Sequence, residues 1–224
     1  MAPGALDQYR IPEDNMRFFT NGTDLSLPHA VVDWRYIGKK DHGLDVLYVG
    51  HVLRVRGLET VVDAARLAKD RGVSLRWTLI GPSNAQERRW LEKKISGLPV
   101  EYLGVLPHAR SLQYIASADV CLCPFPRMMG TEFIYPIKVF EYMAFGKVVV
   151  ATDLPGTRRI IENEKNGFLV PPENPEALVT TLSRLAMDAD LRNRIGREAF
   201  ISVRQYNWVR IHADFIKALE EALG

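Results

Sequence analysis

The chain has 224 residues, of which 47% are hydrophobic and 25% charged, the proportions of an ordinary globular protein. Its formal net charge is only +2, so we expect no nucleic-acid partner held by bulk positive charge. No apolar run has the length of a membrane-spanning helix, so we expect membrane contact to be at most peripheral, at the inner face.

The first residues lack the pattern of a secretory signal, which favours a cytoplasmic protein. The only cysteines, Cys121 and Cys123, are such near neighbours that a disulfide between them would be strained. We therefore expect both thiols to be reduced, as in other cytoplasmic proteins.

Apolar runs and helical patterns alternate from about residue 45 to the end of the chain. Most of the runs are apolar at consecutive positions, which is typical of parallel strands buried on both faces. The alternation predicts an α/β fold with a Rossmann-like, doubly wound parallel sheet. The predicted strands are Val46–Val49, Leu75–Ile80, Val100–Leu103, Val120–Cys123, Val148–Ala151 and Phe168–Val170.

Several sequence signals mark where the helices between these strands begin. Ser83, with Gln86 three residues later, resembles a capping box, and Asn174 before Pro175 marks another helix start. The first 44 residues contain polar turns and little periodicity. We therefore predict a lead-in or interdomain linker over residues 1–44 and one Rossmann-like domain over residues 45–224.

The loop after the first predicted strand is a candidate phosphate site. Gly50 and Gly57 bracket the basic residues His51, Arg54 and Arg56. Glycine lets a phosphate approach the backbone, and arginine binds its oxygens through two nitrogens at once. The loop has neither the Walker ending nor the G-x-G-x-x-G fingerprint, so a solvated arginine loop remains the alternative. The second strand ends in a similar tight turn at Gly81.

A second candidate lies in residues 136–152, which predict a short helix followed by a buried strand. Pro136 suits the first helical position and Gly146 the position after the helix. The free N–H groups of the first turn attract phosphate, and Lys138 adds a positive charge. Glu141 lies one turn further on the same side.

Other acidic and histidine residues have simpler interpretations. Asp188 and Asp190 form a D-x-D pair as in some metal-dependent sugar transferases, but helix capping is the favoured interpretation. No group of His, Cys, Asp and Glu has metal-ligand spacing, so we predict no metal site. We assign no functional role to four scattered histidines: His29, His42, His108 and His212.

Six segments of the chain occur in the order and spacing of one known family. They are Asn21–Asp24, Val46–Gly57, Ala118–Pro124, Lys138–Thr152, Asn166–Leu178 and Tyr206–Trp208. The chain from about residue 15 onward therefore resembles the C-terminal, donor-binding half of GT-B glycosyltransferases. Among these it resembles the retaining enzymes of family four (glycosyl transferases group 1).

The resemblance implies that the ligand is a nucleoside diphosphate sugar, the donor. Arg56 stands where the family has a lysine on the diphosphate, and His51 where it has an arginine. Glu141 matches the second glutamate of the family's E-x7-E pattern, which holds the ribose; the first falls at Phe133, one residue after Glu132. The implied donor-binding residues are Gly50, His51, Arg54, Arg56, Gly81, Leu106, Phe133, Ile137, Lys138 and Glu141, and the implied catalytic residues are Arg56, Lys138 and Glu132.

The resemblance also implies a mechanism. As the sugar leaves the diphosphate, negative charge grows there, and Arg54, Arg56 and Lys138 would stabilise it together with the helix N-terminus. No metal or other cofactor is needed, and the anomeric configuration is retained. Backbone groups near Val105–Pro107 would bind the base.

In the family, the acceptor site lies on an N-terminal domain that precedes the segments found here. We therefore expect this chain to fold alone but to transfer no sugar alone. Its surface toward the missing domain, or toward a second copy in a homodimer, should be apolar. The candidates for this surface are Phe125, Met128, Met129 and Phe133.

Two other functions remain open. The chain could be a nucleotide-binding module without transferase activity, which would bind a nucleotide and ignore the sugar. It could also be another GT-B-like enzyme, such as a sugar-nucleotide epimerase or a phosphorylase; a phosphorylase would need a pyridoxal lysine, which we cannot place.

Overall fold

The computed structural model describes residues 19–28 and 43–223. Within these ranges six parallel strands form one sheet in the order β3-β2-β1-β4-β5-β6. The chain winds outward from the centre of the sheet, first to one edge and then to the other, which confirms the predicted doubly wound fold. The strands are β1 (Leu44–Val49), β2 (Leu75–Ile80), β3 (Val100–Tyr102), β4 (Val120–Cys123), β5 (Val148–Thr152) and β6 (Phe168–Val170).

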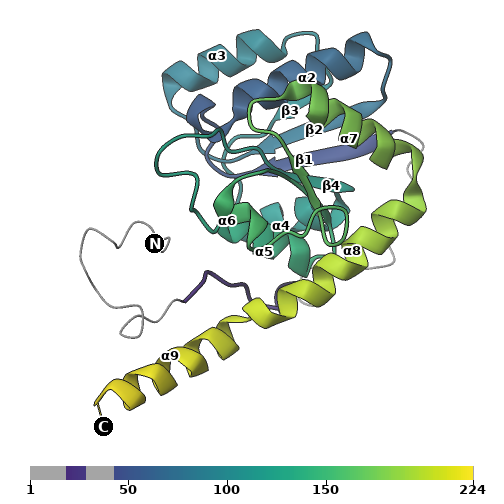
Figure 1. Ribbon diagram of the computed structural model, residues 1–224. Helices are drawn as coiled ribbons and strands as arrows, with labels where there is room; N and C mark the ends of the chain where they lie inside the picture. Colours follow the sequence, from purple (N-terminus) through teal and green to yellow (C-terminus); the bar gives the residue numbers. More distant parts are fainter. Residues whose placement is uncertain (1–18, 29–42, 224) are drawn as a thin grey trace.

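Helices connect the strands and cover both faces of the sheet (Figure 1). The α-helices are α2 (Leu58–Asp70), α3 (Ala85–Ile95), α4 (His108–Ser117), α5 (Ile137–Ala144), α6 (Pro155–Arg158), α7 (Pro175–Met187), α8 (Ala189–Val203) and α9 (Trp208–Leu223). Two short 3-10 helices are η5 (Arg54–Arg56) and η6 (Arg204–Tyr206). Among the described helices, none combines the length and the apolar character needed to cross a membrane.

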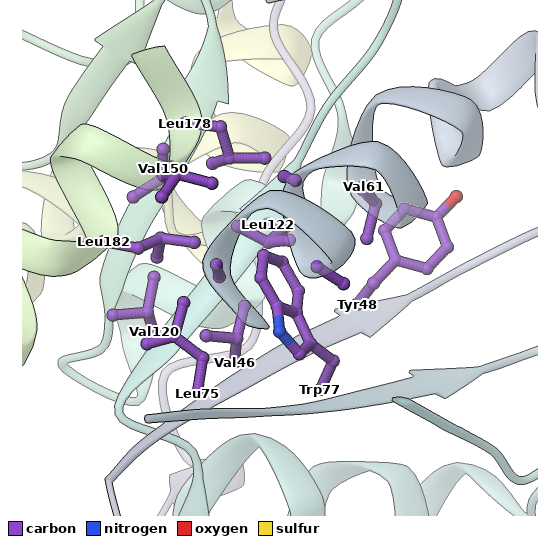
Figure 2. Close-up of a cluster of buried hydrophobic side chains, with 14 of the residues drawn as sticks. Val46, Tyr48, Val61, Leu75, Trp77, Val120, Leu122, Val150, Leu178 and Leu182 are labelled. Carbon is purple, nitrogen blue, oxygen red and sulfur yellow. The ribbon is translucent and has the colours of Figure 1, made fainter. Parts of the chain in front are cut away.

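The sheet separates two hydrophobic cores. Helices α2, α3 and α7 pack on one face, where Trp77 and Tyr48 are the largest fully buried side chains (Figure 2). Helices α4 and α5 pack on the other face, and α8 contributes Leu191 and Ile195 to the first core and Ala199 and Val203 to the second. Residues adjacent in a strand contribute to opposite cores, which explains why the strand sequences are apolar at consecutive positions.

The two cysteines lie side by side in the second of these cores. Cys121 and Cys123 are both buried and neither forms a disulfide, as the sequence predicted. Burial raises the pKa of the Cys123 thiol to about 11, so this thiol is neutral and unreactive at ordinary pH.

Two predicted helix starts are displaced by one residue. The N-cap of α3 is Asn84, whose side chain accepts hydrogen bonds from the N–H groups of Gln86 and Glu87. Ser83 is not the cap, because its hydroxyl donates to the carbonyl of Val52 at 2.8 Å. Helix α5 begins at Ile137, so Pro136 is its N-cap and not its first helical residue.

The other predicted helix ends are confirmed. Asn174 and Asp188 cap α7 and α8 through their side chains. Gly146 follows the end of α5 with a positive φ of 62°. Asp188 is therefore a helix cap, as expected.

Helix α9 extends away from the body of the domain (Figure 1). Residues 19–28 pack near its start, where Thr23 donates its N–H to the carbonyl of Tyr206 and accepts from Trp208 N–H. Further along, the rings of Phe19 and Phe215 meet edge to face at 5.2 Å. Most of the predicted linker, with His29 and His42, lies outside the described residues, so the boundary at residue 44 stays a prediction.

Substitution of Leu182 tests the packing between the sheet and α7, because this side chain is fully buried there. We expect Leu182→Ala to lower the free energy of unfolding by about 2–5 kcal/mol, through lost burial and a residual cavity. The matched control on the same helix is Met187→Ala, whose side chain is 84% exposed and whose loss should cost less than about 0.5 kcal/mol. Urea denaturation of both variants is the measurement, and equal losses would contradict this packing.

Candidate functional site

The direction of winding reverses between β1 and β4, and we call the region beyond the carboxyl ends of these strands, at Val49 and Cys123, the crevice. These strands are paired only at Val46 and Leu47, whereas β1 stays paired with β2 up to Val49. Ligands of doubly wound sheets bind at this switch point, beyond the carboxyl ends of the strands. The loop after β1, the end of β4 and the start of α5 all meet there.

Two cations lie together at this crevice. The Lys138 ammonium, from the first turn of α5, is 4.1 Å from the centroid of the Tyr48 ring and 5.5 Å from that of Phe125. The Arg56 guanidinium is 5.4 Å from the same Phe125 ring. Among the described residues, no carboxylate forms a salt bridge with either cation. Two like charges with no paired carboxylate among these residues form a site suited to an anion.

The electrostatics of Lys138 agree with this geometry. Burial lowers the pKa of Lys138 to about 8; the positive charge of Arg56 acts in the same direction, while Cys123 and Glu141 act in the opposite one. Bound phosphate would oppose the first two effects, because it supplies the negative charge that stabilises the ammonium.

Two glycines make room for this arrangement. Gly50 has a φ of 145°, and a side chain there would collide with the Lys138 ammonium. Gly81, at the end of β2, has a φ of 137°, and a side chain there would strike the backbone carbonyl of Gly50. The positive φ favours glycine at both positions, and at Gly81 the close backbone of Gly50 also excludes a side chain.

The start of α5 adds polar groups to the same place. No side chain caps this eight-residue helix, and its N-cap is Pro136. The N–H groups of its first turn, at Ile137 and Lys138, lie at the positive end of the helix dipole. The side chain of Ile137 is 48% exposed.

Arg54 is not brought to the other cations. Its guanidinium binds Glu87 of α3, with Nε 3.1 Å and Nη2 3.0 Å from Oε1, and lies over the Trp90 ring. The hydrogen bond from Arg54 lowers the pKa of Glu87. The charge of the Arg54 guanidinium is therefore paired with that of the Glu87 carboxylate, and we leave Arg54 out of the candidate site.

Glu141 lies one turn beyond Lys138 and faces the start of α4. Its Oε1 is 3.4 Å from Nε2 of His108, the first residue of α4. The sequence analysis gave His108 no role, because the pair is 33 residues apart and only helix packing brings it together. Leu106, two residues before His108, is half-buried at the same edge.

The remaining predicted residues lie around the crevice with fewer contacts. His51 is exposed, and its carbonyl accepts a hydrogen bond from the Tyr48 hydroxyl at 2.8 Å. The Glu132 carbonyl accepts from Gly156 N–H at 2.7 Å, while its carboxylate is 4.0 Å from Nε of Arg127. No contact with Lys138 or Arg56 is present for Glu132 within the described segments.

The predicted apolar surface needs one correction. Phe125 is only 4% exposed, because its ring packs beside the two cations. Met128, Met129 and Phe133 are exposed, as predicted. Within residues 19–28 and 43–223, no cluster of three or more His, Cys, Asp or Glu residues could hold a metal ion.

A doubly wound sheet with two cations at its switch point is typical of α/β domains that bind nucleotides. Residues 43–188 match the family model of glycosyl transferases group 1, and the chain belongs to this family. It is similar to the phosphatidyl-myo-inositol mannosyltransferase of Mycobacterium tuberculosis, with 27% identity over 91% of this chain and 53% of that protein. The chain therefore spans about half the length of this curated relative.

Solved structures share the fold. Sucrose-phosphate synthase from Thermosynechococcus elongatus superposes with a TM-score of 0.78 and 26% identity, over 98% of this chain and 56% of that one. HepE of Anabaena, in complex with UDP and glucose, gives a TM-score of 0.75 at 21% identity, over 97% of this chain and 60% of that one. The fold is thus one Rossmann-like half of a GT-B glycosyltransferase, which confirms the predicted fold and family.

The buried ammonium gives Lys138 a measurable effect on stability. Its pKa is about 8 in the folded chain and about 10.4 in an unfolded one, so between these pH values the unfolded state binds more protons. Stability contributed by this group should therefore rise from about pH 8 to about pH 10. We expect the free energy of unfolding of wild type, minus that of Lys138→Met, to rise by at least about 1 kcal/mol over this range. Urea denaturation across the range measures it, and a constant difference would contradict the buried position.

Proposed function

We propose that this chain is the donor-binding half of a retaining glycosyltransferase that needs no metal and transfers a sugar from a nucleoside diphosphate sugar to an acceptor. The observation that carries the proposal is the pair of cations, Arg56 and Lys138, beside one buried phenyl ring with no salt-bridged carboxylate among the described residues. A diphosphate has the charge and the size to bind both.

The other groups at the crevice fit the remaining parts of such a donor. The carboxylate of Glu141, near His108, would accept hydrogen bonds from the ribose hydroxyls. The base would lie near Leu106, bound largely by backbone groups. The transferred sugar would face Glu132 and Phe133 in the loop before α5, with His51 on the opposite side. The structure of HepE with UDP and glucose supports a nucleotide of this kind.

The chemistry follows from where charge develops. Cleavage of the bond between the anomeric carbon and the diphosphate leaves the electron pair on a phosphate oxygen. The guanidinium of Arg56, the ammonium of Lys138 and the N–H groups of the first turn of α5 would stabilise that oxygen. Fixed positive groups replace the role of a metal ion in this scheme. Retention of configuration is part of the proposal through the family resemblance.

The acceptor would bind to a further domain. The matched relatives are about twice as long as the aligned part, and we propose that such a domain completes the enzyme. The exposed Met128, Met129 and Phe133 would face it or, in its absence, a second copy. By itself this chain should bind donor and transfer nothing. The reduced thiols suit the cytoplasmic location that we predict.

Calorimetric titration with UDP, GDP, ADP and their common sugar conjugates tests the donor site. One nucleotide should bind saturably, and both Arg56→Ala and Glu141→Ala should weaken it at least about tenfold, as expected for hydrogen bonds to charged groups. The control is Arg66→Ala, a surface arginine paired with Asp63, which should leave affinity unchanged. Wild-type affinity in Arg56→Ala would contradict the proposal. Equal affinity for bare nucleotide and sugar conjugate would favour the non-catalytic module.

The protonation of Lys138 gives a second test. Only the ammonium form binds phosphate strongly, so affinity for the bound nucleotide should fall as pH rises through about 8. Lys138→Arg keeps its charge over this range, so its affinity should change less with pH. Calorimetry from about pH 7 to about pH 9.5 compares the two profiles. Parallel profiles would show that Lys138 does not contact the diphosphate.

A further inference from the structure

Tyr142 occupies the point where β1 and β4 separate. Gly50 N–H donates to the carbonyl of Ile80 on β2 at 2.9 Å. Along an extended strand, neighbouring residues direct their polar groups to opposite sides, so those of Val49 face β4. The pairing with β4 has already ended at Leu47. Without another partner, both polar groups of Val49 would be unpaired at the edge of the core.

The hydroxyl of Tyr142 supplies both hydrogen bonds. It accepts from the N–H of Val49 at 2.9 Å and donates to the carbonyl of the same residue at 3.3 Å. The side chain is fully buried, and burial raises the pKa of Tyr142 well above its ordinary value, so the hydroxyl stays protonated. One helix side chain therefore replaces the missing strand partner.

These bonds join the two halves of the anion site. Val49 directly precedes Gly50 and the loop that carries Arg56. Tyr142 lies one turn beyond Lys138 on α5 and next to Glu141. A Cβ built at Gly50 would lie 2.4 Å from the Lys138 ammonium, so this ammonium lies directly against the Gly50 backbone. A small shift of α5 along β1 would therefore separate Lys138 from Arg56.

We propose that Tyr142 is a positioning residue: its paired hydrogen bonds to Val49 hold the start of α5 against the β1 loop and so set the spacing of the diphosphate-binding groups. This inference rests on the proposed function. It assigns no ligand contact to Tyr142, which acts through the residues on either side of the crevice.

The test compares Tyr142→Phe with Leu182→Ala, which lowers stability from the opposite face of the sheet. Phenylalanine keeps the ring and removes only the hydroxyl, leaving the Val49 groups unpaired. Titration uses whichever of UDP, GDP and ADP binds the wild type. We expect Tyr142→Phe to weaken binding about tenfold and Leu182→Ala to change it less than about twofold. In Tyr142→Phe the pH at which affinity falls should also move upward, as the Lys138 ammonium gains water.

A purely structural role predicts a different result. If Tyr142→Phe loses stability but keeps the wild-type affinity and pH profile, the inference is overturned. If the wild type binds none of the three nucleotides, the proposed function fails, and this inference fails with it. If the wild type binds and Tyr142→Phe binds equally well, only this inference fails.

Amide hydrogen exchange on the wild type covers the case in which Tyr142→Phe does not fold. Adding the bound nucleotide should slow exchange at Val49 N–H together with the amides of the Gly50 loop and of α5. Slower exchange in the loop and α5 with an unchanged rate at Val49 would overturn the inference.

Discussion

The separation of β1 from β4 is the constraint on which the rest of this domain depends. Because the two strands stop pairing after Leu47, the sheet opens at its centre and exposes polar backbone on both sides of the gap. Tyr142 satisfies the backbone of Val49 on β1, and the start of α5 nearby has no side-chain cap. The uncapped first turn of α5 therefore adds partial positive charge to that of Lys138 and Arg56.

Aromatic rings make it feasible to keep two cations beside this gap. The face of a ring attracts a positive charge, so Tyr48 and Phe125 offset part of the cost of removing Lys138 and Arg56 from water. The offset is incomplete, since the pKa of Lys138 remains lowered to about 8. Keeping a desolvated ammonium charged lowers the stability of the free protein. A bound anion stabilises that ammonium, so part of the lost free energy returns as affinity for the anion.

The basic loop after β1 shows how packing divides similar residues between two tasks. Arg54 and Arg56 lie two residues apart in a 3-10 helix, and the sequence predicted that both contact the donor. In the fold, Arg54 forms an ion pair with Glu87 on α3, whereas Arg56 lies over the Phe125 ring at the crevice. Only one of the two charges therefore remains for a ligand.

The sequence by itself determined the sheet, its order of elements and most helix ends, because these follow from local patterns of apolar and capping residues. It also located the two candidate phosphate-binding segments, since glycines and a helix start are local signals. Only the tertiary structure decided which side chains meet. The burial of Phe125, the pairing of Arg54 with Glu87 and the contact between His108 and Glu141 join residues on different elements. Such contacts depend on how the helices pack on the sheet, and the spacing of residues along the chain does not specify this packing.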